Sequence, residues 1–158
     1  MTTNNIIQLV FDIAVLALIW YAGYYDKKTR LVEPWVQWTF LCIGLAHTVF
    51  LFIVSDSLYM PLNCIFTGVG VFAFYLLLVF IFEQGIGGGD TKMTSLMGLF
   101  LGWEQGFTVV IIHCLVALAY VGIMKLVKKK HIASVPAMIY MAIGYTVVKA
   151  VYWTAEIL

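Results

Sequence analysis

Charged residues are scarce in this chain of 158 residues, where Asp, Glu, Lys and Arg together make up 11%. An ordinary soluble domain is about a quarter charged and roughly half apolar, whereas 63% of this chain is hydrophobic. This composition argues against a soluble globular core and predicts a polytopic membrane protein. We expect one membrane-embedded domain over residues 1–158, because no room remains for a second sizeable soluble domain.

Cysteine is also scarce, and its placement argues against two common uses. The three cysteines, Cys42, Cys64 and Cys114, stand inside apolar runs and lack C-x-x-C spacing. They therefore predict neither a disulfide framework nor a zinc site. A cleaved signal peptide is not expected either, because MTTNN before the first apolar run has no basic residue and no small-residue cleavage site follows it.

Long apolar runs are what the chain has in abundance. A helix needs about 20 predominantly apolar residues to cross a bilayer. The candidate spans are Ile6–Tyr25, Trp35–Val54, Leu62–Phe82, Thr91–Gly102, Gly106–Val127 and Pro136–Glu156. The sequence therefore predicts an all-α fold with six transmembrane helices.

The fourth candidate span is unusually short. Asp90 and Trp103 are 13 residue steps apart, which gives roughly 20 Å of helix against a hydrocarbon core of about 30 Å. We expect the glycine-rich loop before this span to dip into the inner leaflet, buried in protein or lining a wet cavity. The G-x-x-x-G spacing of Gly98 and Gly102 predicts close packing of this helix on a neighbour.

Basic residues are distributed asymmetrically. Of the nine Lys and Arg residues, all except Lys149 fall on the side reached after the first, third and fifth spans. Because cytoplasmic loops are enriched in Lys and Arg, we predict that these three loops are cytoplasmic and that both termini lie outside.

The stretch EQGIGGGDTKM, residues 83–93, places glycines and a carboxylate between two apolar spans. It does not match the phosphate-binding pattern G-x-x-x-x-G-K-[ST], and Asp90 would repel a phosphate. A simple interpretation is a glycine turn in which Asp90 caps the following helix. That interpretation does not explain the consecutive Gly87, Gly88 and Gly89, which suggest close approach by a helix or an extended peptide.

Asp26 follows the first span and is predicted to lie at the same cytoplasmic face of the membrane as Asp90. Taken alone, Asp26 is a typical polar residue at the end of a membrane span. Two aspartates at one face suffice for aspartyl proteolysis, however, because an ionised carboxylate takes a proton from water while a protonated one polarises the scissile carbonyl. A shared proton separates the two titrations. We expect Asp90, at a helix N-terminus, to be the ionised partner, and the mechanism needs neither metal nor cofactor.

The segments around both aspartates resemble motifs of the type IV prepilin peptidases and their archaeal preflagellin-peptidase relatives. GIGGGDTKMTSLMGLFLGW, residues 85–103, is similar to the second aspartate motif, with matches at Gly87, Gly89, Asp90, Lys92, Gly98 and Gly102. YYDKKTRLVEPWV, residues 24–36, resembles the first motif. KKKHIASVPAMIYMAIGY, residues 128–145, resembles the last cytoplasmic loop and final helix.

The resemblance implies an aspartic endopeptidase that removes the basic leader from type IV pilin-like or archaellin-like precursors. It also implies a prokaryotic plasma (inner) membrane with the active site facing the cytoplasm. The implied partners are the precursor and the bilayer, without nucleic acid. Pro34 follows Asp26 by eight residues where the family usually has seven, so the placement of the second helix stays open. The chain resembles the short form without a methyltransferase region, so we expect no N-methylation of the product.

Three charged residues near the aspartates have two interpretations each. Glu33 and Glu83 would either attract the basic leader or serve as solvated boundary charges, which is the simpler interpretation. Lys92 would either orient Asp90 or contact lipid phosphate.

Four ionisable residues, Asp12, His47, His113 and Lys149, stand within the apolar spans, where such groups are costly. We expect a structural polar layer, with an Asp12–Lys149 contact if the first and last helices are neighbours. The alternatives are a proton path or a metal site from Asp12, His47 and His113, or outward-facing side chains.

Two other function classes stay open at the sequence level. One is a small transporter or channel whose broken fourth helix lines a substrate path, although no internal repeat or second broken helix is evident in the sequence. The other is a non-catalytic membrane scaffold.

Overall fold

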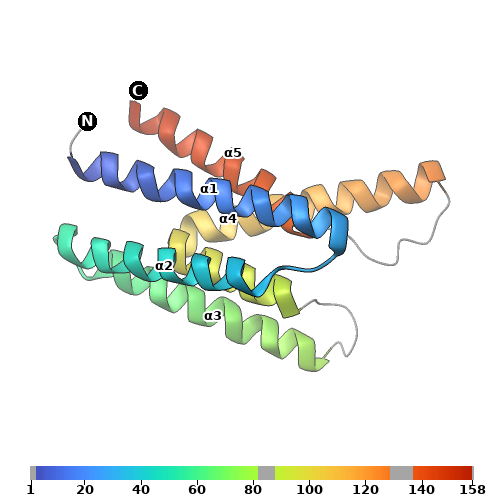
Figure 1. Ribbon diagram of the computed structural model, residues 1–158, viewed down its shortest axis with the longest axis horizontal. Coiled ribbons are helices and arrows are strands. Elements are labelled where there is room, and N and C mark those ends of the chain that lie inside the picture. The colour runs from blue at the N-terminus through green and yellow to red at the C-terminus, as the bar shows by residue number, and fades with distance from the viewer. Residues whose placement is uncertain (1–2, 82–87, 129–136, 158) are drawn as a thin grey trace.

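The computed structural model describes residues 3–81, 88–128 and 137–157. Regular structure in these residues is helical throughout: α1 (Thr3–Thr29), α2 (Pro34–Val54), α3 (Tyr59–Ile81), α4 (Gly88–Lys128) and α5 (Ala137–Ile157). The helices form one elongated bundle, with the N- and C-terminal ends of the chain at the same end of it (Figure 1). The predicted all-α class is therefore confirmed.

Four helical stretches in the described residues are long and apolar enough to cross a membrane. They are Asn4–Thr29, Pro34–Val54, Tyr59–Leu77 and Gly88–Met124. This supports the membrane character predicted from composition, whereas the count of six spans stays a prediction.

α1 continues beyond Tyr25, where the apolar run suggested its end. Its last turn carries Lys27 and Lys28, whose charges complement the negative end of the helix dipole. Arg30 then adopts a left-handed conformation with φ of 59° and donates its backbone N–H to the Asp26 carbonyl at 2.9 Å, which terminates the helix. Asp26 thus lies within the last turn of α1.

α4 is divided at Gly102, whose φ of 70° and ψ of −172° are not helical. This conformation is essentially restricted to glycine. A Cβ added at Gly106 would lie 3.6 Å from the Cα of Gly98, whereas eight residues of straight helix span about 12 Å. The chain therefore turns back at Gly102, which separates an N-terminal arm (residues 88–101) from a C-terminal arm (residues 103–128).

The N-terminal arm of α4 packs tightly on α3. A Cβ added at Gly98 would lie 3.1 Å from the Thr67 methyl group, and one added at Gly102 would lie 3.0 Å from Asn63 Nδ2. The Ser95 hydroxyl also donates to the carbonyl of Gly68 at 2.7 Å. The close packing expected from the G-x-x-x-G spacing is thus present, and α3 is the neighbour.

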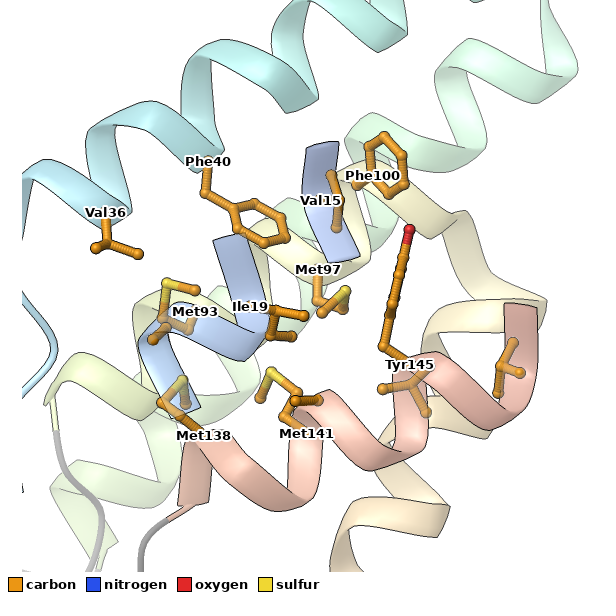
Figure 2. Close-up of a cluster of buried hydrophobic side chains, with 14 residues drawn as sticks. Val15, Ile19, Val36, Phe40, Met93, Met97, Phe100, Met138, Met141 and Tyr145 are labelled. Carbon is orange, nitrogen blue, oxygen red and sulfur yellow. The ribbon is translucent and has the colours of Figure 1, made fainter. Parts of the chain in front are cut away.

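A buried cluster fills the centre of the bundle (Figure 2). Its members include Val15, Ile19, Val36, Phe40, Met93, Met97, Phe100, Met138, Met141 and Tyr145. The four methionines come from α4 and α5, and such flexible side chains fill irregular gaps between helices. On α1 the cluster stands between Asp12 and Asp26, so it separates two polar ends of the molecule.

Candidate active site

Asp26 belongs to α1 but is held by α5. Its side chain is 6% exposed, and its Oδ2 accepts a hydrogen bond from the backbone N–H of Met138 at 3.0 Å. Met138 is the second residue of α5, where backbone N–H groups lack a partner within the helix. Asp26 thus caps α5 from a different helix.

The packing of α1 on α5 makes this cap possible. Gly23, which precedes Asp26 by three residues, is buried against Ile139. A Cβ added at Gly23 would lie 3.0 Å from the Ile139 Cα and 3.2 Å from its backbone nitrogen. The absence of a side chain at Gly23 therefore lets the first turn of α5 approach α1 within reach of the Asp26 carboxylate.

Asp90 lies in the first turn of α4 and is partly buried. The helix begins at Gly88, two residues earlier, so Asp90 stands inside the first turn and not at the capping position before it. The Thr94 hydroxyl donates to the backbone carbonyl of Asp90 at 2.8 Å. A Cβ added at Gly89 would lie 3.4 Å from Val32, so the start of α4 packs against the α1–α2 connection.

Asp26 and Asp90 lie at the same end of the bundle, where Gly89 at the start of α4 packs against Val32 in the connection that follows α1. Each also lies at the positive end of a helix dipole, α5 for Asp26 and α4 for Asp90. Ile19 of α1, Met93 of α4 and Met138 of α5 belong to one buried cluster (Figure 2). This shared packing fixes the three helix segments that carry and hold the two carboxyl groups.

Glu33 lies between α1 and α2, and partners within the chain engage its carboxylate. Its Oε2 accepts hydrogen bonds from the Tyr21 hydroxyl at 2.9 Å and from the Trp35 indole N–H at 2.8 Å. The two aromatic rings pack on each other with centroids 5.2 Å apart. Glu33 thus connects the end of α1 to the start of α2, while its attraction of a basic leader stays a prediction.

The remaining predicted site residues fall into two groups. Gly88, Gly89 and Lys92 lie in the first turns of α4, with the Lys92 side chain exposed. Glu83 and Gly87 lie outside the described residues, as does most of the glycine-rich loop. The predicted depth of that loop in the inner leaflet therefore stays a prediction.

Met138 is a site residue that the sequence did not reveal. It acts through its backbone N–H, and a backbone group leaves no signature in side-chain chemistry. The sequence offered one indirect signal for this contact. The last helix is predicted to start on the same side of the membrane as Asp26.

The predicted contact between Asp12 and Lys149 is present at the other end of the cluster. Lys149 Nζ lies 2.9 Å from Asp12 Oδ1, and the Trp153 indole N–H donates to Asp12 Oδ2 at 3.1 Å. His47 Nε2 is hydrogen-bonded to Gln8 Oε1 at 2.9 Å. Within the described ranges, no group of three or more His, Cys, Asp or Glu side chains is placed to hold a metal ion.

These observations define an all-helical protein of membrane type with an acidic pair at one end of its bundle. Residues 13–122, which include both aspartates, match the type IV leader peptidase family. The match covers more than half of the chain, and the chain belongs to this family.

One relative is the preflagellin peptidase of Methanocaldococcus jannaschii. It is 36% identical over 89 residues, which make up 56% of this chain and 36% of that protein. The aligned part of the chain thus spans little more than a third of the relative's length. No solved structure matches the chain.

Proposed function

We propose that the protein is a membrane aspartic endopeptidase in which Asp26 and Asp90 form the catalytic pair. The observation that carries this proposal is that α1 and α4 bring two aspartates to the same end of the bundle, in a member of the type IV leader peptidase family. The substrate is a pilin-like or archaellin-like precursor, cleaved between its basic leader and the following hydrophobic helix.

Asp26 acts as the general base in this mechanism. Its carboxylate accepts the Met138 N–H, and a hydrogen bond to the charged form favours ionisation. Asp90 carries the proton that the two carboxyl groups share. This assignment reverses the expectation from sequence, which considered only the helix N-terminus at Asp90. Asp26 also lies at a helix N-terminus, that of α5, and accepts the Met138 N–H there.

The reaction requires only water and these two groups. Asp26 takes a proton from water, whose oxygen attacks the scissile carbonyl carbon, while Asp90 gives its proton to the carbonyl oxygen. When the tetrahedral intermediate collapses, the C–N bond breaks and the proton on Asp26 passes to the leaving nitrogen. Asp90 recovers its proton as the carbonyl re-forms, which restores the starting state.

The site lies at the cytoplasmic membrane face in this proposal. Lys27, Lys28 and Arg30 follow Asp26 within one turn, and such basic residues favour the cytoplasmic side. Each arm of α4 crosses the membrane separately, which yields six spans and places both termini outside.

Co-expression with a pilin-like precursor in a host that lacks its own leader peptidase tests the proposal. The native chain should yield a shortened precursor, detected by its mobility and by the sequence of its new N-terminus. Asp26→Asn and Asp90→Asn should each lower processing by about 100-fold or more, since acid–base groups contribute on the order of 10²–10⁴ in rate.

The matched control is Asp56→Asn, which changes an exposed aspartate between α2 and α3 and should process normally. Normal processing by either site variant at an equal membrane level would exclude the proposed pair. A transporter or a scaffold would give no shortened precursor with any variant, the native chain included.

A further inference from the structure

The connection between α1 and α2, residues 30–33, lies beside the carriers of both aspartates. It begins four residues after Asp26. Its Val32 side chain packs against the start of α4, where a Cβ added at Gly89 would lie 3.4 Å from Val32 Cβ and Cγ2. Gly89 directly precedes Asp90. The course of this connection therefore affects where the first turn of α4 lies relative to the end of α1.

Glu33 occupies the N-cap position of α2, but its side chain makes no capping hydrogen bond. Its Oε2 instead accepts hydrogen bonds from the Tyr21 hydroxyl of α1 at 2.9 Å and from the Trp35 indole N–H of α2 at 2.8 Å. Hydrogen bonds to a carboxylate are roughly twice as strong as those between neutral groups. These two hydrogen bonds, called the Glu33 bridge below, join the two helices through one oxygen.

Val32 directly precedes Glu33 and is restrained by several contacts. Its carbonyl accepts a hydrogen bond from Gln37 Nε2 at 3.4 Å, and its side chain packs against the buried cluster. Because consecutive Cα atoms are fixed about 3.8 Å apart, a restraint on Glu33 also limits the movement of Val32. The Glu33 bridge therefore acts on the residue that contacts Gly89.

We propose that Glu33 is a positioning residue of the candidate active site. Its bridge holds Val32 against Gly89, and this contact keeps Asp90 in place relative to Asp26. The role rests on the proposed function, and it depends on the two hydrogen bonds and not on the negative charge itself.

The competing role of Glu33, attraction of a basic leader, depends on the charge, so substitutions separate the two roles. Glu33→Gln removes the charge but keeps an oxygen that accepts hydrogen bonds, whereas Glu33→Leu removes both. Tyr21→Phe combined with Trp35→Phe removes both donors and leaves the carboxylate in place. The matched control is Asp56→Leu, which changes an exposed acidic residue in the connection at the other end of α2.

Steady-state processing of a pilin-like precursor by the full-length protein in nanodiscs separates kcat from KM. A misplacement of about 1 Å can cost on the order of 100-fold in rate. We therefore expect Glu33→Leu and the Tyr21→Phe/Trp35→Phe double variant each to lower kcat by about tenfold or more, with KM unchanged. Glu33→Gln and Asp56→Leu should keep the native kcat.

Two kinetic results would overturn the positioning role. One is a native kcat in both Glu33→Leu and the double variant. The other is equal impairment of Glu33→Gln and Glu33→Leu, above all as a raised KM, which indicates attraction of the leader by charge. If Glu33→Leu does not fold, the double variant decides the outcome, because Tyr21 and Trp35 are exposed and each keeps an aromatic ring.

A distance measurement between two spin labels tests the bridge without reference to processing. With the native cysteines replaced by alanine, Leu31→Cys labels the connection and Glu104→Cys labels an exposed position just past the turn in α4. Adding Glu33→Leu should broaden the distance distribution, whereas adding Glu33→Gln should leave it narrow. Equal distributions overturn the bridge whether or not the native chain processes the precursor. Absence of processing by the native chain instead overturns the proposed function, and the positioning role with it.

Discussion

At the residue scale, Asp26 combines a structural role with its proposed chemical role. The carboxylate that would take a proton from water also satisfies a backbone N–H in the first turn of α5. A donor in the backbone of a packed helix cannot rotate away as a side-chain donor can. The geometry that orients this carboxylate therefore depends on the contact between α1 and α5.

The two roles of Asp26 can be separated by substitution. Asp26→Asn keeps an oxygen that accepts the Met138 N–H, so its Tm should stay near that of the native protein while precursor processing is lost. Asp26→Ala removes the acceptor and should cost about 1 kcal/mol, the usual cost of losing a helix cap. Unfolding of both variants in one lipid composition measures the difference, and equal Tm values would contradict the capping role.

Lys149 provides a second test at this scale, because it pairs with a buried carboxylate. Lys149→Met leaves Asp12 buried without its cation, and breaking such a pair typically costs about 3–5 kcal/mol. Adding Asp12→Asn to Lys149→Met should recover part of this loss, so the two changes should be non-additive. Thermal unfolding of the two single variants and the double variant measures the coupling.

The exposed Lys28 supplies the control, since Lys28→Met removes a charge without exposing a buried partner. Its Tm should change little. Native stability in both Lys149→Met and Asp12→Asn would show that the ion pair does not stabilise the bundle.

At the element scale, the reversal of α4 depends on Gly102. Its φ of 70° and ψ of −172° are strained for any other residue, and a Cβ there would lie 3.0 Å from Asn63 Nδ2. Gly102→Ala should therefore lower the stability by at least about 1–3 kcal/mol. The reduced Tm should be accompanied by a lower membrane level.

Gly70 of α3 is the matched control for this substitution. It is helical, and a Cβ added there would meet nothing within 4 Å. Gly70→Ala should be neutral or stabilising by up to about 1 kcal/mol, because alanine favours helix. Equal Tm values for Gly102→Ala and Gly70→Ala would show that the turn tolerates a side chain.

Several elements could be predicted from the apolar pattern because burial in lipid requires long apolar helices. The predicted span Trp35–Val54 differs from α2 by one residue at its start. The end of α1 was placed four residues too early, because apolarity ends at Tyr25 whereas backbone hydrogen bonding continues through Lys27 and Lys28. Hydropathy reports where side chains prefer lipid, and it does not report where a helix ends.

The candidate site was only partly predictable, for a different reason. Residue types identified Asp26 and Asp90, and the basic residues placed them at one predicted face. Their approach depends on helix packing at positions such as Gly23 and Ile139, and the Met138 donor is a backbone group. Neither the packing nor the backbone donor can be read from residue identity in one sequence.

At the scale of the whole molecule, the methionine-rich cluster separates two polar ends of the bundle. The aspartate pair lies at one end, and the Asp12–Lys149 ion pair lies at the other. Cysteine labelling in intact and permeabilised cells tests how these ends face the membrane. Cys42, Cys64 and Cys114 are first replaced by alanine, and Lys28→Cys, Asp56→Cys or Glu104→Cys then introduces one exposed thiol.

The number of spans determines the outcome at Glu104, which is exposed and follows the turn at Gly102. With six spans, an impermeant thiol reagent should label Glu104→Cys and Asp56→Cys in intact cells, and Lys28→Cys only after permeabilisation. If the stretch Gly88–Met124 crossed the membrane only once, position 104 would lie roughly 24 Å along it from residue 88. Position 104 would then lie close to the middle of the stretch, and so near the middle of the membrane. The reagent would label the thiol of Glu104→Cys poorly from either side.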